Sequence, residues 1–271
     1  MVKLIVCDID NTLVPKHKKP SERTLKCIHE FEKRGILFGL ASGRHYDGLK
    51  DLANQWGIHV DLYIGMNGAE IYDDSDGEHE ITGGLKKEWL KEIFEIMQPF
   101  YDFTNPNVMV DGKRYVRRMD EITMEAFRYS AAGNLPVVVE DESIFWSQDM
   151  FKIGFRTQAK IMPLIEAHVA KFPNDNYYGV KTEYTMYEFS PVIAQKGVML
   201  ERYCKKHGIA IEDTVGFGDM SNDISLLKSA GTGVCMFNGS SDTKAVADVI
   251  TELSIEDDGF ADYCEKHILN D

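Results

Sequence analysis

Three short, uninterrupted apolar runs near the N-terminus limit what this chain can fold into. They are residues 3–7 (KLIVC), 36–41 (ILFGLA) and 61–66 (DLYIGM). Runs this short, with no polar alternation, predict strands that are buried on both faces, as in a parallel sheet. Between them, apolar residues recur at helical spacing at Leu25, Ile28 and Phe31, and then at Leu49, Leu52 and Trp56. The alternation of strands and helices predicts an open, parallel α/β sheet.

The alternation is interrupted between residues 83 and 186, where strands are expected in pairs. One of these pairs is a hairpin, NVMV-DG-KRYV, because Asp111-Gly112 favours a tight turn. The first pattern resumes after Pro191 with a helix, a strand (DTVGFG), a second helix and a further strand. We therefore expect a Rossmann-like parallel-sheet core formed by residues 1–82 and 187–271. An α+β module, residues 83–186, is inserted into it.

The overall charge excludes several classes of partner. The 271 residues include 30 basic and 44 acidic side chains, a net charge of −14. Such a field disfavours nucleic acid and anionic membranes, and no apolar run approaches the ~20 residues that cross a bilayer. Because Asp8 and Asp10 break the N-terminal apolar run, we expect no signal peptide and therefore a cytoplasmic protein. We also expect a monomer or a small homo-oligomer. An odd count of five cysteines without CxxC predicts reduced thiols rather than disulfides or zinc.

The first polar cluster follows the first apolar run, at Asp8, Asp10 and Thr12 in CDIDNTL. Open α/β sheets place ligands at the carboxyl ends of their strands. Two carboxylates there can converge on Mg²⁺, which prefers oxygen ligands. One of them can also attack phosphorus while the other transfers a proton. The alternative is that these residues only cap a turn.

Two further clusters lie at comparable strand ends. Ser42, Gly43 and Arg44 follow the second apolar run, where a hydroxyl and the N–H groups of a helix start can bind an anion. A serine that only caps the helix is the alternative. The second cluster is GFGDMSNDISLL, with metal-capable side chains at Asp219, Asn222 and Asp223.

Lys196 is unusual for its position. It begins the helix that follows the inserted module, where the helix dipole disfavours a cation. A local rule that is broken in this way is typical of a functional residue. A surface lysine is the alternative interpretation.

In this order, the four clusters resemble the motifs of the haloacid dehalogenase superfamily of phosphohydrolases. DxDxT is matched by Asp8, Asp10 and Thr12, the second motif by Ser42, the third by Lys196, and GDxxND by Gly218, Asp219, Asn222 and Asp223. The inserted module is similar to the cap of the Cof-type phosphatases, and the stretches NGAEI (67–71) and AGTGVCMFNG (230–239) match that group. Asn11 stands where relatives often have glycine, a position that asparagine tolerates.

The resemblance implies a phosphoric monoester hydrolase with Mg²⁺ as cofactor. It assigns Asp8 as nucleophile and metal ligand, and Asp10 as general acid and base with its backbone carbonyl on the metal. Asp219 and Asp223 complete the metal site. The resemblance places Ser42, Lys196, Asn222 and the Gly43 backbone on the phosphoryl oxygens, and we add Thr12 and Arg44 to this expected substrate-binding set.

The expected substrate is a small phosphorylated metabolite, such as a sugar phosphate, a nucleotide or a cofactor phosphate. Specificity is expected in the cap, with Arg117, Arg118 and Glu183 as candidate residues. Two alternatives remain at this point. One is a phosphosugar mutase that uses the same nucleophile, and the other is a non-catalytic metabolite-binding protein on the same fold.

Overall fold

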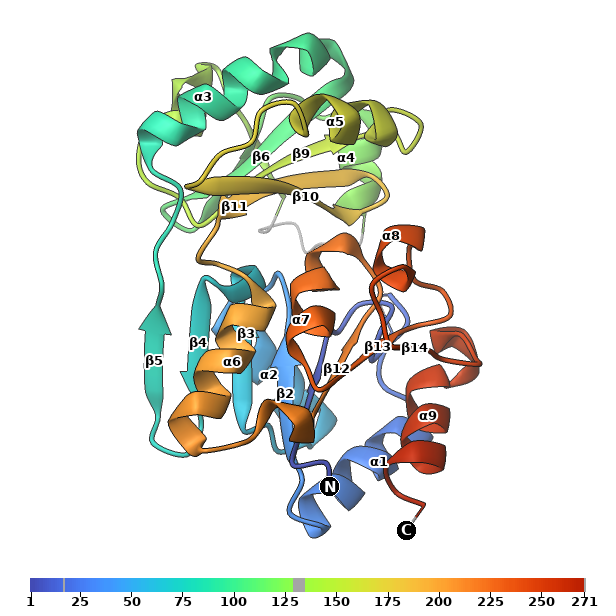
Figure 1. The fold of residues 1–271 in the computed structure, drawn as a ribbon. Coiled ribbons are helices and arrows are strands. Elements are labelled where there is room, and N and C mark those ends of the chain that lie inside the picture. The colour runs from blue at the N-terminus through green and yellow to red at the C-terminus, as the bar shows by residue number, and fades with distance from the viewer. Residues whose placement is uncertain (17, 129–134, 271) are drawn as a thin grey trace. The chain divides into compact units, whose positions relative to one another are not determined.

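The computed structural model describes residues 1–16, 18–128 and 135–270. The chain forms two compact units (Figure 1). Unit 1 consists of Met1–Thr82 and Ile193–Asp271, and unit 2 of Gly83–Val192. Residues 187–192, which the sequence analysis assigned to the core, lie in unit 2. Strand β11 (Met186–Pro191) contains all of them except Val192, and it pairs with two strands of that unit.

Unit 1 is built on an eight-stranded sheet in the order β14-β13-β12-β1-β2-β3-β4-β5. Neighbouring strands from β14 to β3 are parallel, and β4 and β5 are antiparallel to their neighbours. The strands are β1 (Leu4–Cys7), β2 (Leu37–Ala41), β3 (Leu62–Gly65), β4 (Glu70–Asp73), β5 (Glu78–Ile81), β12 (Thr214–Gly218), β13 (Thr232–Cys235) and β14 (Val249–Ile250). The predicted parallel α/β core is confirmed.

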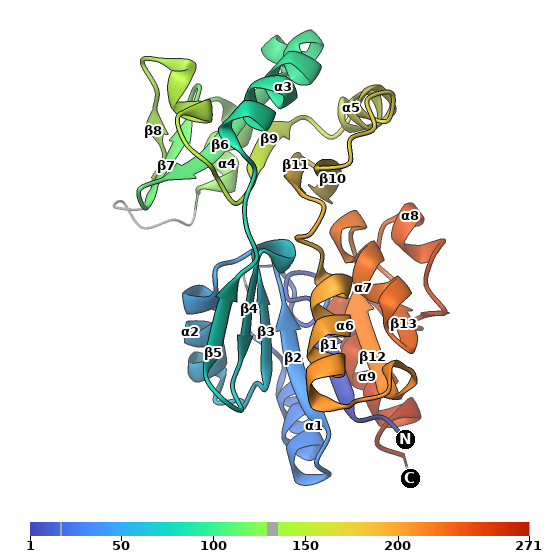
Figure 2. The ribbon, with the colours of Figure 1, turned by 60° about the vertical axis from the view of Figure 1, so that its left-hand side comes forward.

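The buried apolar runs explain the layers of unit 1. Along β1, Ile5 and Cys7 belong to one apolar cluster and Leu4 and Val6 to another, because alternate residues of a strand point to opposite faces. Helices α1 (Glu22–Lys33), α2 (Tyr46–Trp56) and α9 (Gly259–His267) supply side chains to the first cluster. Helices α6 (Lys196–His207) and α7 (Ile224–Ser229) supply the second, and both lie on the opposite side of the sheet from α1 and α2 (Figure 2). The short helix α8 spans Ser241–Lys244.

Two polar residues, Ser21 and Asn11, shape the backbone around β1 and α1. Ser21 caps α1, and its Oγ accepts a hydrogen bond from the Thr24 N–H at 3.0 Å. Asn11 adopts a φ of 65°, the left-handed conformation that asparagine tolerates. Among the residues described, no helix is both long and apolar enough to span a membrane.

Unit 2 is a six-stranded sheet in the order β10-β11-β9-β6-β7-β8, antiparallel except for the β7–β8 pair. Its strands are β6 (Thr104–Val110), β7 (Lys113–Val116), β8 (Val137–Val138), β9 (Ile153–Thr157), β10 (Tyr177–Glu183) and β11 (Met186–Pro191). The predicted hairpin is β6–β7, and Asp111 and Gly112 adopt φ values of 49° and 74° at its turn.

The apolar core of unit 2 lies on one face of its sheet. Helices α3 (Lys87–Met97) and α5 (Met162–Val169) contribute Leu90, Ile93 and Ile165 to a cluster that also contains Phe155 and Phe189. Figure 1 shows both helices on the same side of β6 and β9. A third helix, α4 (Glu121–Ala126), contributes no buried residue to this cluster.

Candidate active site

Three of the predicted site residues directly follow the carboxyl ends of parallel strands in unit 1. Asp8 follows β1, Ser42 follows β2 and Asp219 follows β12. Because β12, β1 and β2 are adjacent and parallel, their carboxyl ends meet at the same edge of the sheet. Asp223 lies one turn beyond Asp219, in a short helical turn formed by Ser221–Asp223.

Three of the predicted carboxylates form a buried cluster. An oxygen of each of Asp8, Asp219 and Asp223 lies within 4.8 Å of the others, and the three residues are 7%, 3% and 1% exposed. The fully buried amino group of Lys196 donates to Asp8 Oδ1 and to Asp223 Oδ1, both at 2.6 Å. The surface-lysine interpretation of Lys196 is therefore wrong.

The cluster holds more acidic groups than its single ammonium group can neutralise. Burial raises the pKa of Asp8 to about 7, although Lys196 acts to lower it. Burial also raises the pKa of Asp219 well above its usual range, and the charges of Asp8 and Asp223 raise it further. Burial alone would lower the pKa of Lys196, but the two carboxylates outweigh that effect and raise it. A cation would remove this imbalance.

Backbone contacts fix the carboxylates on the β12 side of the cluster. Asp223 Oδ2 accepts the N–H groups of Asp219 at 2.9 Å and of Met220 at 3.1 Å. A Cβ atom on Gly218 would lie only 2.3 Å from the Cβ of Asp223, so the close approach requires glycine. The Thr12 hydroxyl, which is fully buried, donates to Asp219 Oδ1 at 2.9 Å.

Asp10 lies outside the buried cluster. Its side chain is 32% exposed, and both of its oxygens accept hydrogen bonds from Arg44 Nη2, at 3.0 and 2.9 Å. Sequence reasoning placed both residues in the site but did not anticipate that they bind each other. The pair links the loop after β1 to the loop after β2.

The loop after β2 places Ser42 at the same edge of the sheet. Ser42 is buried, its N–H donates to the Ile64 carbonyl at 2.8 Å, and its hydroxyl oxygen accepts the Arg44 N–H at 3.4 Å. Gly43, between them, is half-buried. These contacts hold the segment in place and leave the Ser42 hydroxyl proton to donate elsewhere.

Asn67 joins the site although sequence analysis gave it no role. It is buried with a left-handed φ of 58°, its N–H donates to the Ser42 carbonyl at 2.9 Å, and its Oδ1 accepts from Asn222 Nδ2 at 3.2 Å. The stretch NGAEI pointed to this segment only through the family resemblance. The Asn222 Oδ1 atom is buried and has no hydrogen-bond partner among the described residues. A bound cation or a donor group of a ligand would satisfy it.

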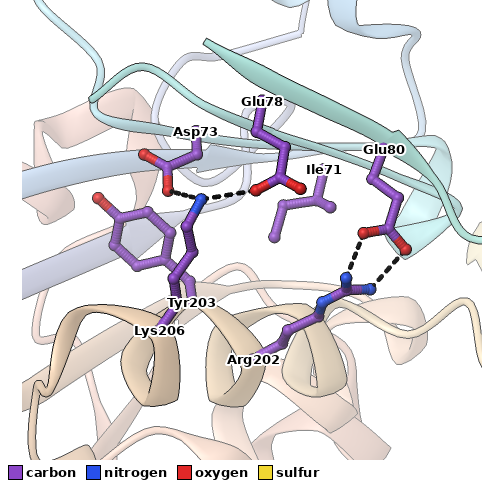
Figure 3. A pocket seen from close by; sticks show the side chains of 7 residues that line it. All are labelled: Ile71, Asp73, Glu78, Glu80, Arg202, Tyr203 and Lys206. Atoms are coloured by element: carbon purple, nitrogen blue, oxygen red, sulfur yellow. Dashed lines mark hydrogen bonds and ion pairs between the residues drawn. The ribbon is translucent and has the colours of Figure 1, made fainter. Parts of the chain in front are cut away.

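Unit 1 also contains a cavity of about 240 Å³ that includes none of the predicted site residues. Figure 3 shows it between the β4–β5 hairpin and α6, lined by Ile71, Asp73, Glu78, Glu80, Arg202, Tyr203 and Lys206. Arg202 pairs with Glu80, and Lys206 pairs with Asp73 at 2.7 Å and Glu78 at 2.8 Å. Because both cations are paired, these contacts join the hairpin to the helix.

In unit 2, the charged residues singled out from the sequence are engaged in ion pairs. Arg117 Nε lies 2.6 Å from Glu142 Oε1, and its guanidinium stacks 3.7 Å from the centre of the Tyr101 ring. Arg118 Nε lies 3.1 Å from Asp120. Glu183 lies 3.6 Å from Arg156, a residue that the sequence analysis did not consider.

Comparisons with known proteins show the family to which this chain is similar. A model of the haloacid dehalogenase-like hydrolases matches residues 5–263. The phosphatase YwpJ of Bacillus subtilis is 26% identical, over 99% of this chain and 100% of its own. The 5-amino-6-(5-phospho-D-ribitylamino)uracil phosphatase YitU of the same organism is 25% identical, over 97% of each chain.

A solved structure shows the same fold. BT1666 of Bacteroides thetaiotaomicron, described among phosphatases of the haloalkanoate enzyme superfamily, matches with a TM-score of 0.75 and 22% identity. The match covers 98% of this chain and 95% of that one, so it includes both units.

Proposed function

Since this chain belongs to the haloacid dehalogenase-like hydrolases, we propose that it is a Mg²⁺-dependent phosphatase with Asp8 as its nucleophile. The substrate is a small phosphorylated metabolite, such as a sugar phosphate, a nucleotide or a cofactor phosphate. The observation that carries the proposal is the position of the Lys196 amino group between Asp8 and Asp223 in a buried acidic cluster. Relatives named as phosphatases give further support.

Asp8, Asp219 and Asp223 are the side chains that would hold Mg²⁺, and Asp10 adds its backbone carbonyl by family resemblance. The carboxylate oxygens are ligands that Mg²⁺ prefers, and their number exceeds the charge that Lys196 can balance. When bound, Mg²⁺ supplies a Lewis acid that offsets negative charge on the phosphoryl oxygens. The remaining chemistry belongs to side chains of this protein.

The reaction takes two steps in this proposal. First, an oxygen of Asp8 attacks phosphorus, the ester P–O bond breaks, and Asp10 gives its proton to the leaving oxygen. Asp8 then carries the phosphoryl group. Second, water attacks phosphorus and gives a proton to Asp10, and the Asp8–phosphorus bond breaks to release phosphate. In this structure both oxygens of Asp10 accept hydrogen bonds from Arg44.

Donors around Asp8 stabilise the charge that develops on the phosphoryl group. Lys196 supplies a fixed positive charge, and the hydroxyl of Ser42 and the backbone N–H of Gly43 supply neutral donors. Asn222 and Arg44 lie on neighbouring loops and complete the set in this proposal. Unit 2 acts as the cap that selects the substrate.

The test is phosphate release from a panel of phosphomonoesters, with and without Mg²⁺, by the wild type and by Asp8→Asn. Metal-dependent release that Asp8→Asn lacks is the expected result, and Asp47→Asn, an exposed acid on α2, is the matched control. Full activity in folded Asp8→Asn would contradict the assigned nucleophile. Isomerisation without phosphate release would identify a mutase, and binding without turnover would identify a binding protein.

The proposal includes a reducing, cytoplasmic location. All five cysteines are free and buried, and burial raises the pKa of Cys7 and Cys264 well above the usual range. Thiols in this state are poorly reactive and need no disulfide for the fold. A monomer or a small homo-oligomer completes the proposal, and light scattering would measure it.

A further inference from the structure

Glu70 is a buried acidic residue of unit 1 that the proposed mechanism does not use. It is the first residue of β4 and is 5% exposed. A carboxylate that is removed from water in this way needs hydrogen-bond donors to offset the lost hydration. The donors that surround Glu70 therefore indicate what it holds in place.

Both carboxylate oxygens of Glu70 contact the start of helix α2. Oε2 accepts the backbone N–H of Tyr46, the first residue of that helix, at 2.9 Å. Oε1 lies 3.0 Å from Nδ1 of His45. Burial alone would raise the pKa of Glu70, but the hydrogen bonds from His45 and from the Tyr46 N–H outweigh it and hold the pKa below its usual range. Glu70 is therefore ionised at neutral pH.

Helix α2 receives its capping acceptor from another element of the fold. The first N–H groups of a helix have no acceptor within it, and a serine, threonine, aspartate or asparagine at the N-cap usually provides one. His45 occupies the N-cap of α2, and in the described structure its side chain gives the helix no capping hydrogen bond. Glu70 supplies the acceptor from β4, and its negative charge suits the positive end of the helix dipole.

The segment just before α2 carries the donors that the proposed function assigns to the phosphoryl group. The connection between β3 and β4 holds this segment through its backbone as well. The Ser42 carbonyl accepts the N–H of Asn67 at 2.9 Å, and the Arg44 carbonyl accepts the N–H of Met66 at 2.8 Å. Glu70 lies a few residues further along the same connection and fixes the end of the segment that enters the helix.

Gly65 makes room for these contacts. It lies opposite Glu70 in the pairing of β3 with β4. A Cβ atom on Gly65 would lie 2.7 Å from Glu70 Oε2 and 3.1 Å from the Arg44 carbonyl oxygen. A side chain at this position would therefore displace the carboxylate from the helix start that it caps.

We propose that Glu70 is a positioning residue, whose carboxylate fixes the start of α2 and so sets the places of Ser42 and Arg44 in the proposed phosphoryl-binding site. Glu70 itself touches neither the substrate nor the reacting atoms. The inference rests on the proposed phosphatase function, and all of its residues lie in unit 1. A displacement of about 1 Å in a binding group can cost about 100-fold in rate, so loosening this segment should impair turnover.

Neutral replacements of Glu70 test the proposal. Glu70→Ala removes both acceptors, so kcat/KM for a phosphomonoester should fall by about tenfold or more. Glu70→Gln keeps one oxygen that can accept the Tyr46 N–H and should recover part of that loss. The affinity for Mg²⁺, measured by calorimetric titration, should stay near the wild-type value in both variants, because the side chains that would hold the metal follow β1 and β12.

Asp73→Ala is the matched control. Asp73 is a buried acid of the same strand, and it pairs with Lys206 at 2.7 Å and with His207 at 2.6 Å. These partners are at the end of α6 that is remote from Lys196. This variant should lower the Tm as Glu70→Ala does, but should keep kcat/KM near the wild-type value. Equal losses of kcat/KM in the two folded variants would contradict a positioning role. If Glu70→Ala does not fold, Glu70→Gln beside Asp73→Asn gives the same comparison.

Amide hydrogen exchange separates this inference from the proposed function, because it needs no substrate. In Glu70→Ala the N–H groups of Ser42 and Arg44 should exchange faster than in the wild type, whereas Asp73→Ala should leave them unchanged. If the wild type hydrolyses no phosphomonoester, the proposed function fails, and faster exchange still supports the hold of Glu70 on this segment. Unchanged exchange in folded Glu70→Ala, or unchanged kcat/KM in an active enzyme, would overturn the inference.

Discussion

Both units bury charged side chains beside a β-sheet, but they leave opposite charges unsatisfied. In unit 1, three carboxylates surround one ammonium group, so negative charge is in excess. In unit 2, Arg156 Nε is a buried donor without a hydrogen-bond partner among the described residues, whereas the carboxylate of Glu188 is paired with Lys152. Each arrangement costs stability without a ligand. The comparison shows that this acidic protein buries its excess carboxylates in unit 1 and an unsatisfied guanidinium donor in unit 2.

The largest expected effect comes from removing the amino group of Lys196 from the buried acidic cluster of unit 1. Lys196→Met leaves buried carboxylates without their ammonium partner, so we expect a loss of about 3–5 kcal/mol of unfolding free energy and loss of turnover. Urea unfolding measures the first effect and phosphate release the second. Lys205→Met, an exposed residue of the same helix, should change neither. A stable, active Lys196→Met would show that the cluster tolerates its excess charge.

Binding of Mg²⁺ should offset the excess negative charge of the buried acidic cluster in unit 1. A ligand that binds only the native state at about 100 times its Kd stabilises it by about 2.7 kcal/mol, so Mg²⁺ should raise the Tm. Asp219→Asn, which removes one carboxylate of the cluster, should reduce the rise. An unchanged Tm of the wild type at saturating Mg²⁺ would contradict the metal site.

The effect of Mg²⁺ should depend on pH. Because burial raises the pKa of Asp8 to about 7, this carboxyl group is protonated in the metal-free protein at lower pH. Protons then compete with Mg²⁺, so its affinity should rise as pH increases from about 5 to 7 and level off above. Calorimetric titration across this range measures the affinity. A constant Kd over the range would contradict the raised pKa.

A smaller loss of unfolding free energy is expected when a partly buried lysine of unit 2, Lys152, is replaced by methionine. Lys152→Met removes the partner of Glu188, but the positive charge of Arg114 also interacts with that carboxylate and remains to offset it. We therefore expect a loss of about 1 kcal/mol or less, near the value for a partly exposed ion pair. Urea unfolding beside Lys196→Met gives the direct comparison. Equal losses in the two variants would mean that unit 2 has no excess of positive charge.

Much of unit 1 could be predicted from the sequence, because its strands are continuous apolar runs that need no knowledge of their partners. The predicted α/β fold is confirmed, and so is the expected enzyme class, a phosphoric monoester hydrolase of the haloacid dehalogenase type. The meeting of Asp8, Ser42 and Asp219 at one edge of the sheet follows from parallel strands alone.

Other contacts could not be predicted, because they depend on register and side-chain geometry. The pairing of Asp10 with Arg44 and the contact of Asn67 with Asn222 join loops that are separate in sequence. In unit 2, Arg117 and Arg118 were expected as candidate specificity residues, but both form ion pairs with nearby acids. The sequence also predicts a helix at about 121–132. Residues 129–134 lie outside the described part of the chain, and helix α4 ends at Ala126.

The ion pairs between the β4–β5 hairpin and α6 have a consequence for behaviour at high concentration. Strand β5 is at the end of the sheet order, and a sheet edge exposes backbone groups that can pair with another molecule. Glu78 and Glu80 place carboxylates along this edge, and Lys206 and Arg202 fix them in position. Two copies of the protein that met edge to edge would bring these carboxylates together, so we expect the network to disfavour aggregation through β5.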